Sequence, residues 1–143
     1  MTIRKIMALS LIIMMMVAAA SCEKQMLVVA DCSECYADEP GSAVIKIKIR
    51  EIPEYHTGIT INVYEGSDTN SPLIYSFIVY NGEQTADVAL NRTYTVEAVY
   101  RIDSRIYRAI DSVRPTLKYA KYDCDEPCWY IYNNIANVRL KYF

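Results

Sequence analysis

The middle of the chain alternates hydrophobic and polar residues over short stretches. Across residues 43–50, isoleucines at every second position alternate with lysine and arginine. Residues 58–66 repeat the pattern, with Ile59, Ile61 and Val63 on one side. A period of two places successive side chains on opposite faces of a β-strand. Both stretches therefore predict strands with one face in a core and one face in water.

Residues 73–79 are apolar at nearly every position, which predicts a central strand or one covered on both faces. The Asn81-Gly82 step that follows is typical of a two-residue hairpin turn, because both central residues of such a turn need positive φ. It predicts a hairpin whose second strand lies over residues 84–90.

Further short strands follow along the rest of the chain, separated by turn residues. They are predicted over residues 93–102, 105–113, 116–124, 128–132 and 136–143. With the four above, the chain has about nine strands, and no helix is predicted after the first 21 residues. Regularly spaced short strands are typical of an all-β, two-sheet antiparallel sandwich.

The first 21 residues have a different pattern. Arg4 and Lys5 precede an almost wholly apolar run of 15 residues, from Ile6 to Ala20. A membrane-spanning helix needs about 20 apolar residues, whereas two cations followed by a shorter apolar run are typical of a secretory signal. Residues 1–21 are therefore predicted to form a signal helix that is removed on maturation.

The apolar run ends in Ala19-Ala20-Ser21-Cys22, which resembles the lipobox of bacterial lipoproteins. The resemblance implies a diacylglycerol on the Cys22 thiol, cleavage just before Cys22, and a further acyl chain such as palmitate on the new amine. Cys22 is then the lipidation site and the point of contact with the membrane. Three acyl chains would anchor the protein firmly, since one myristoyl chain binds only marginally. The alternative is an ordinary cleaved signal with Cys22 present by chance.

Removal of the signal changes the composition of the chain. The mature 122 residues lose two basic residues and no acidic ones, so the net charge moves from −2 to −4. A mildly acidic surface argues against a nucleic-acid partner and against electrostatic docking on anionic lipid. The length suits one domain. We predict a lipidated tether over residues 22–42 and a sandwich domain over residues 43–143.

Four cysteines remain after Cys22, in two clusters. Cys32 and Cys35 lie in the tether, and Cys124 and Cys128 lie near the C-terminus. An even number in an exported protein predicts disulfide bonds. Three pairings are open, and two crossed bonds would pin the tether to the last strands. The alternative is a structural zinc site, since four thiolates supply a tetrahedral set of ligands.

Aromatic residues crowd the C-terminal third of the chain. Trp129, Tyr130, Tyr132 and Tyr119 are candidate contacts for a sugar or a protein partner, because aromatic rings offer a large area at low entropic cost. The alternative is that tyrosine simply favours strands. Rings that form an exposed ridge would favour binding, and a Trp129 packed on the disulfides would favour a structural role.

No motif in the sequence indicates catalysis. His56, the sole histidine, lies in a predicted loop, and no serine or cysteine has a motif that would make it a triad partner. The sequence contains neither a glycine-rich phosphate loop nor EF-hand spacing. We therefore predict a protein that is not an enzyme and needs no cofactor.

Two stretches resemble strands of known sandwich families. Residues 90–100, LNRTYTVEAVY, look like the Leu-x-x-x-Tyr-x-Val-x-Ala strand of prealbumin-like and carboxypeptidase-regulatory-like domains, and residues 61–66 resemble their Val-x-Val-Tyr strand. The tripeptide NRT stands where those families usually have Pro-Gly before the tyrosine. The resemblance implies a prealbumin-like or Ig-like sandwich in which Tyr94 begins a core strand after a tight turn.

The chain as a whole resembles the small outer-membrane lipoproteins of the Bacteroidetes, with a lipid cysteine, a short acidic linker that contains cysteines, and one sandwich. The resemblance implies attachment to the cell outer membrane, facing either the periplasm or the surface. Asp111-Ser112-Val113 also resembles the O-glycosylation acceptor of these bacteria, which implies a glycan on Ser112.

These observations predict a lipid-anchored cell-envelope protein that acts as a non-catalytic interaction or accessory module. Its expected partners are the membrane, through Cys22, and another envelope protein or a glycan. Two alternatives stay open. One is a carbohydrate-binding accessory lipoprotein that uses its surface aromatics, and the other is a structural zinc protein with a four-cysteine site.

Overall fold

The structure, a computed structural model, describes residues 30–50, 58–80 and 82–141. The predicted signal, Cys22 and His56 lie outside the described residues. The described part contains nine strands and one short 3-10 turn. In chain order these are η1 (Cys32–Glu34), β1 (Ser42–Lys48), β2 (Ile59–Glu65), β3 (Leu73–Val79), β4 (Glu83–Ala89), β5 (Tyr94–Ile102), β6 (Arg105–Val113), β7 (Thr116–Ala120), β8 (Cys128–Tyr132) and β9 (Ile135–Asn137). Within the described part, no helix has the length and apolarity to cross a membrane.

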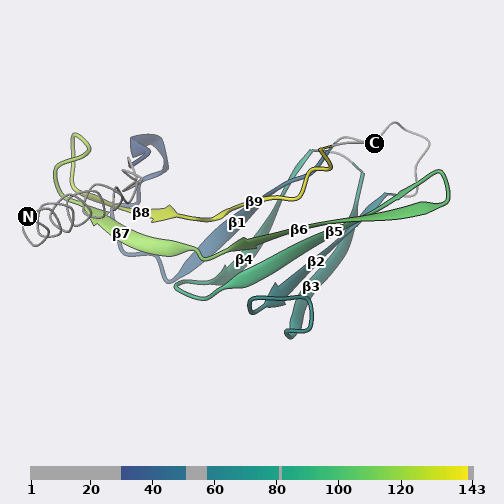
Figure 1. The fold of residues 1–143 in the computed structure, drawn as a ribbon. Helices are drawn as coiled ribbons and strands as arrows, with labels where there is room; N and C mark the ends of the chain where they lie inside the picture. Colours follow the sequence, from purple (N-terminus) through teal and green to yellow (C-terminus); the bar gives the residue numbers. More distant parts are fainter. Residues whose placement is uncertain (1–29, 51–57, 81, 142–143) are drawn as a thin grey trace, which may run out of the picture.

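Seven of the strands form two sheets that pack together (Figure 1). One sheet has the order β4-β1-β9 and the other has the order β3-β2-β5-β6. Buried side chains of both sheets form one hydrophobic cluster. The predicted all-β, two-sheet sandwich is thereby confirmed. Neighbouring strands are antiparallel except for β1 and β9, which run parallel.

The period-two stretches form strands whose apolar side faces the core, as predicted. Ile45 and Ile47 of β1 and Ile59 and Ile61 of β2 are fully buried. The alternate positions of both strands are only partly buried. The central strand β5 differs, because seven consecutive residues are buried, on both faces of the strand. Its outward face carries Glu97, which is only 2% exposed.

The chain enters β5 through a tight turn that Tyr94 closes. Asn91 has a φ of 60°, which asparagine tolerates better than most residues, and its N–H donates to the Pro115 carbonyl at 2.8 Å. The buried Tyr94 donates its hydroxyl proton to the Ala89 carbonyl at 3.1 Å. The side chain therefore ties the start of β5 to the end of β4, and Tyr94 does begin a core strand after a turn.

Two predictions about residues 73–79 are wrong. Among the described residues, β3 pairs only with β2 and lies at the edge of its sheet, so most of its side chains are exposed. It also forms no hairpin with the next strand, because β4 belongs to the other sheet and pairs with β1. The chain between β3 and β4 therefore crosses from one sheet to the other instead of folding back on the same sheet.

The C-terminal strands continue past the sandwich. β6 is followed after Pro115 by β7, and β8 is followed by β9 after Asn133, which has a φ of 55°. β7 and β8 pair with each other as a two-stranded ribbon that extends away from the two sheets toward η1 (Figure 1). The Asn137 N–H donates to the Asp111 carboxylate at 2.7 Å, which joins β9 to β6.

Candidate functional site

Two disulfide bonds join the N-terminal segment to the ribbon. Cys32 pairs with Cys124 and Cys35 pairs with Cys128, with Cα–Cα distances of 5.7 and 5.5 Å. The predicted disulfides are confirmed, and the structure has the crossed pairing. The bonds link residues 92 and 93 positions apart, and closing one loop of this length stabilises by about 4–5 kcal/mol in the chain-entropy model. We call η1, Tyr36, β7 and β8, with these two bonds, the stapled ribbon.

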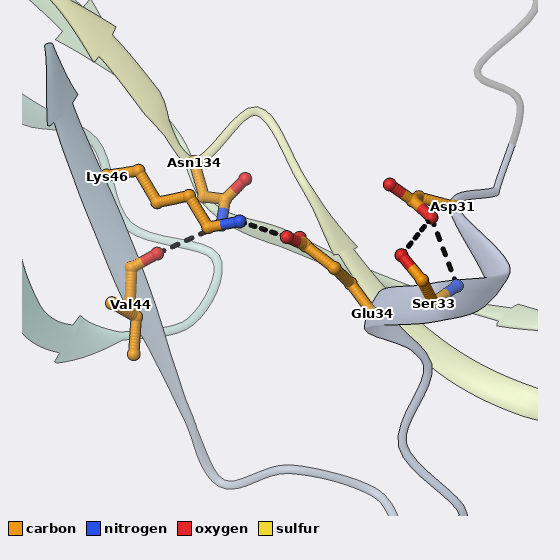
Figure 2. Close-up of polar contacts among 6 residues, drawn as sticks. All are labelled: Asp31, Ser33, Glu34, Val44, Lys46 and Asn134. Atoms are coloured by element: carbon orange, nitrogen blue, oxygen red, sulfur yellow. Dashed lines mark hydrogen bonds and ion pairs between the residues drawn. The ribbon is translucent and has the colours of Figure 1, made fainter. Parts of the chain in front are cut away.

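The turn η1 forms because a side chain caps it. The Asp31 carboxylate accepts hydrogen bonds from the Ser33 N–H at 3.0 Å and from the Ser33 hydroxyl at 2.6 Å (Figure 2). The bond from the Ser33 hydroxyl is the main cause that lowers the pKa of Asp31. The stapled ribbon also has a small buried cluster separate from that of the sandwich. It consists of Ala30, Ala120, Cys128 and Tyr130, with Cys35, Cys124 and Tyr132 packed against it.

The four cysteine sulfurs lie close together. Those of Cys35, Cys124 and Cys128 are within 4.8 Å of one another, and Cys32 is bonded to Cys124. Zinc binds cysteine as the thiolate, and a sulfur in a disulfide carries no thiolate charge. A zinc ion at this place would therefore require reduction of both bonds first.

Three aromatic side chains form a row across the stapled ribbon. Tyr36 and Trp129 exchange both backbone hydrogen bonds at 2.8 Å, and Trp129 lies opposite Tyr119 in the β7–β8 pair. Residues directly opposite in neighbouring strands place their side chains on the same face. Tyr36 and Tyr119 are 45% and 48% exposed, and the rings of Tyr119 and Trp129 lie 4.9 Å apart. We call these three residues the aromatic row.

The four aromatic residues that the sequence singled out do not form one surface. Tyr130 points to the opposite face of the ribbon, where it is 3% exposed in the small cluster beside the disulfides. The ring of Tyr132 lies on that face too, 6.2 Å from the ring of Tyr130. Only Trp129 and Tyr119 lie on the open face. Sequence reasoning missed Tyr36. A signal was present, since Tyr36 directly follows Cys35 just as Trp129 directly follows Cys128.

A cleft of about 380 Å³ lies between the stapled ribbon and β1. It is lined by residues of η1, β1 and β8 together with Tyr36 and Asn134. Glu34 and Lys46 point toward one another across it and form an ion pair (Figure 2). The hydrogen bond to Glu34 is the main cause that raises the pKa of Lys46. We call this space the ribbon cleft.

Asn134 lines the ribbon cleft and bonds to β1. Its side-chain amide donates to the Val44 carbonyl at 2.9 Å (Figure 2). Its backbone carbonyl accepts from the Lys46 N–H at 2.8 Å. One residue thus joins the ribbon to two alternate positions of β1. The cleft therefore has a fixed wall on the β1 side.

Ser112 lies on β6. The residue is exposed, its N–H donates to the Asp111 carboxylate at 2.9 Å, and its hydroxyl lies 3.4 Å from the Tyr94 carbonyl. An exposed hydroxyl is what a glycan acceptor needs. Glycosylation of Ser112 stays a prediction.

Sequence reasoning also missed a polar network on the outer face of β5. The Glu97 carboxylate accepts hydrogen bonds from Asn62 at 3.1 Å, from Tyr64 at 3.0 Å and from Arg108 at 2.6 Å. Burial raises the pKa of Glu97, but these three donors together outweigh it and lower the pKa. Both carboxylate oxygens are engaged, so the group suits a structural role.

Comparisons of the chain with protein-family models, with curated proteins and with solved structures found no match in any of the three. Its function is therefore inferred from its own residues and their geometry.

Proposed function

We propose that this protein is a lipid-anchored component of the cell envelope and a non-catalytic interaction module that binds its partner through the stapled ribbon. The observation that carries the proposal is the aromatic row, which lies on an open face of a ribbon that extends from the sandwich. Exposed tyrosine and tryptophan are enriched where proteins bind one another, because each ring contributes a large contact area.

The rigidity of the ribbon supports the same conclusion. Tyr36 and Trp129 are joined through both of their peptide groups, and two disulfides hold the neighbouring cysteines. A surface that is ordered before it binds loses little conformational entropy on association. The aromatic row is therefore already in a form that a partner can recognise.

The proposed anchor would place the ribbon close to the membrane. Ala30, where the described chain begins, lies eight positions after Cys22, and an extended chain over that span reaches roughly 30 Å at most. With acyl chains on Cys22, η1 and the ribbon would be the membrane-proximal end of the molecule. This favours a partner that is itself part of the outer membrane.

A carbohydrate ligand is a second candidate. The observation that favours it is the tilted pair of Tyr119 and Trp129 rings, with an interplanar angle of 51°, beside the charged groups of the ribbon cleft. Aromatic rings next to hydrogen-bonding side chains are suited to sugars as well as to proteins. A glycan array that binds the wild-type protein and not Trp129→Ala would favour this candidate.

Cross-linking in intact cells tests the interaction module. We expect p-benzoylphenylalanine at Tyr119 to form a specific covalent adduct on illumination, and the same group at Ile110, an exposed position of β6, to form none. Trp129→Ala should abolish the Tyr119 adduct. Trp129 is only half-buried, so its removal should cost less than the 3–5 kcal/mol typical of a fully buried tryptophan.

Two results would contradict the proposal. One is that no adduct forms at Tyr119. The other is that Trp129→Ala lowers the free energy of unfolding by a full core-residue cost and leaves the adduct unchanged. Thermal unfolding of the same preparations separates the loss of binding from the loss of fold.

A further inference from the structure

Among the described residues, strand β8 has no neighbouring strand along part of one edge. On the side of β8 away from β7, Trp129 pairs with Tyr36. The chain continues from β8 into β9, and β9 pairs with β1. The ribbon cleft lies between these two partners and is lined by Ile131. In the described part of the chain, no strand residue pairs with Ile131 on that side.

The backbone of Ile131 faces the cleft. Peptide groups alternate in direction along a strand. Trp129 uses both its N–H and its C=O to bind Tyr36, so these groups point away from β7. Ile131 lies two residues after Trp129 in the same regular pairing with β7. Its N–H and C=O therefore also point away from β7, toward the cleft. The cleft therefore presents a donor and an acceptor side by side, in the arrangement that a further antiparallel strand would satisfy.

The segment before Tyr36 does not continue the pairing with β8. If the antiparallel pairing of Tyr36 with Trp129 continued, Glu34 would stand opposite Ile131. Instead, residues Cys32–Glu34 form η1, which Asp31 caps and the two disulfides hold. At the other end, Asn134 already occupies the Val44 carbonyl. The result is a gap in a line of β-pairing, with both ends fixed by covalent or hydrogen bonds.

We propose that the ribbon cleft binds an extended peptide segment of an envelope partner, which pairs with Ile131 as an added β-strand. This inference rests on the proposed interaction function and names its ligand. Added strands gain affinity from main-chain hydrogen bonds and specificity from alternate side chains. A peptide supplies the matching acceptor and donor on a single residue, whereas the hydroxyls of a sugar have no such fixed spacing.

The aromatic row defines which side chain the segment should carry. Ile131 lies on the same face as Trp129, since the two residues are two apart in one strand. The peptide residue opposite Ile131 would point its side chain to that face, next to the aromatic row. We therefore expect an apolar residue at that position, with polar residues on either side of it. The Glu34–Lys46 ion pair offers one charge of each sign to those polar residues.

Selection from a displayed library of random octapeptides tests the inference, with the full mature protein and its disulfides intact. The blocking variant is Glu34→Trp, which puts a bulky ring into the cleft from an exposed position. The matched control is Glu34→Gln, which removes the ion pair without filling the space, and an exposed ion pair contributes little stability. We expect peptides with a central apolar residue that bind the wild type and Glu34→Gln alike and bind Glu34→Trp at least about tenfold more weakly.

Amide hydrogen exchange on a selected peptide complex gives the second readout. The Ile131 amide should exchange freely in the unbound protein and become protected when peptide binds. A peptide methylated at the nitrogen opposite Ile131 should lose both the affinity and the protection. If no peptide is selected, if Glu34→Trp binds as well as wild type, or if Ile131 stays unprotected, the inference is wrong.

The outcomes separate this inference from the proposed function. A Tyr119 adduct without any cleft-dependent peptide would leave the interaction module standing and overturn the peptide site. An oligosaccharide that shifts the Trp129 signals and leaves Ile131 unprotected would overturn it too, in favour of the carbohydrate candidate. Loss of both the adduct and the peptide would contradict both proposals.

Discussion

At the scale of single residues, Glu97 has the most unusual environment among the described side chains. A carboxylate that is almost fully buried on the outward face of a central strand loses its hydration, which is costly unless hydrogen bonds replace it. Asn62, Tyr64 and Arg108 provide those bonds. The Ser76 hydroxyl in turn donates to the side-chain amide oxygen of Asn62 at 2.8 Å. The network therefore links β3, β2, β5 and β6 across one face of the sheet.

The pH dependence of stability should report this network. The pKa of Glu97 is lower in the folded protein than the ordinary value of 4.5, so its contribution is fully present above that pH and is lost as the pH falls through the folded value. Glu97→Gln should lower the free energy of unfolding by about 1–3 kcal/mol at neutral pH. Urea titrations from neutral pH down to about pH 3 measure both effects.

The difference between the wild type and Glu97→Gln should narrow as the pH falls, because protonation of the wild-type carboxyl removes the charge that strengthens its hydrogen bonds. A constant difference between the two proteins at every pH would show that the lost contact is steric and not electrostatic. Ser112→Ala is a suitable control, since Ser112 is exposed on the same sheet and does not touch the network.

At the scale of elements, the molecule consists of two packed units with separate clusters of buried side chains. The larger cluster lies between the two sheets, and the smaller one lies beside the disulfides in the stapled ribbon. Among the described residues, no cysteine belongs to the larger cluster. The ribbon, by contrast, has few buried residues and depends on its two covalent bonds, as small units without a large core usually do.

Reduction should therefore act locally. The mature protein purified without reductant should have a mass four hydrogens below that of the four-thiol form, as two disulfides require. After reduction, the amides of β8 should exchange hydrogen faster, while those of β5 stay protected, because β5 belongs to the larger cluster. Hydrogen exchange with mass spectrometry checks this.

The double variant Cys35→Ala/Cys128→Ala, which keeps the Cys32–Cys124 bond, is the control in which only one disulfide is lost. If the β5 amides lost their protection together with those of β8, the two disulfides would be stabilising the whole fold and not the ribbon alone. Four free thiols in the unreduced protein would contradict the assigned bonds themselves and would revive the zinc alternative.

At the scale of the whole molecule, the described chain begins in the stapled ribbon. The first described residue, Ala30, is buried in the ribbon's small cluster and follows the proposed lipidation site by only eight positions. The sandwich would then hold the ribbon at a set distance from the membrane. Binding of an outer-membrane partner at the aromatic row is consistent with that arrangement.

Substitution of the proposed lipidation site tests the anchor. Cys22→Ala, exported with an ordinary cleavable signal in place of residues 1–21, should move from the detergent phase to the aqueous phase in a detergent partition of cell extracts, because acyl chains are the only membrane contact proposed. Mass spectrometry of the N-terminal peptide should show the acyl groups in the wild type. Retention of Cys22→Ala in the detergent phase would contradict the anchor, and Cys32→Ala/Cys124→Ala controls for loss of a cysteine elsewhere.

The strands were predictable from the sequence wherever one face meets water. The alternation of isoleucine with lysine in β1 gives the strand, its buried side and its approximate ends, because period two has one structural meaning. The same reasoning was wrong for β3, since an uncharged edge strand and a central strand have the same pattern. It was also wrong about the partner of β4, because a turn dipeptide reports the local backbone and not the sheet that the chain enters next.

For the stapled ribbon, the sequence by itself predicted that the four remaining cysteines form disulfides, since their number is even in a chain with a predicted export signal. Only the tertiary structure decided which cysteines pair, because pairing depends on distances between segments some 90 residues apart. The same holds for the aromatic row and the ribbon cleft. Composition and periodicity report the neighbours of a residue along the chain. Tyr36 meets Trp129 only because the folded chain places the two segments side by side. For the same reason, Ile131 pairs with β7 on one side and with no described strand residue on the other.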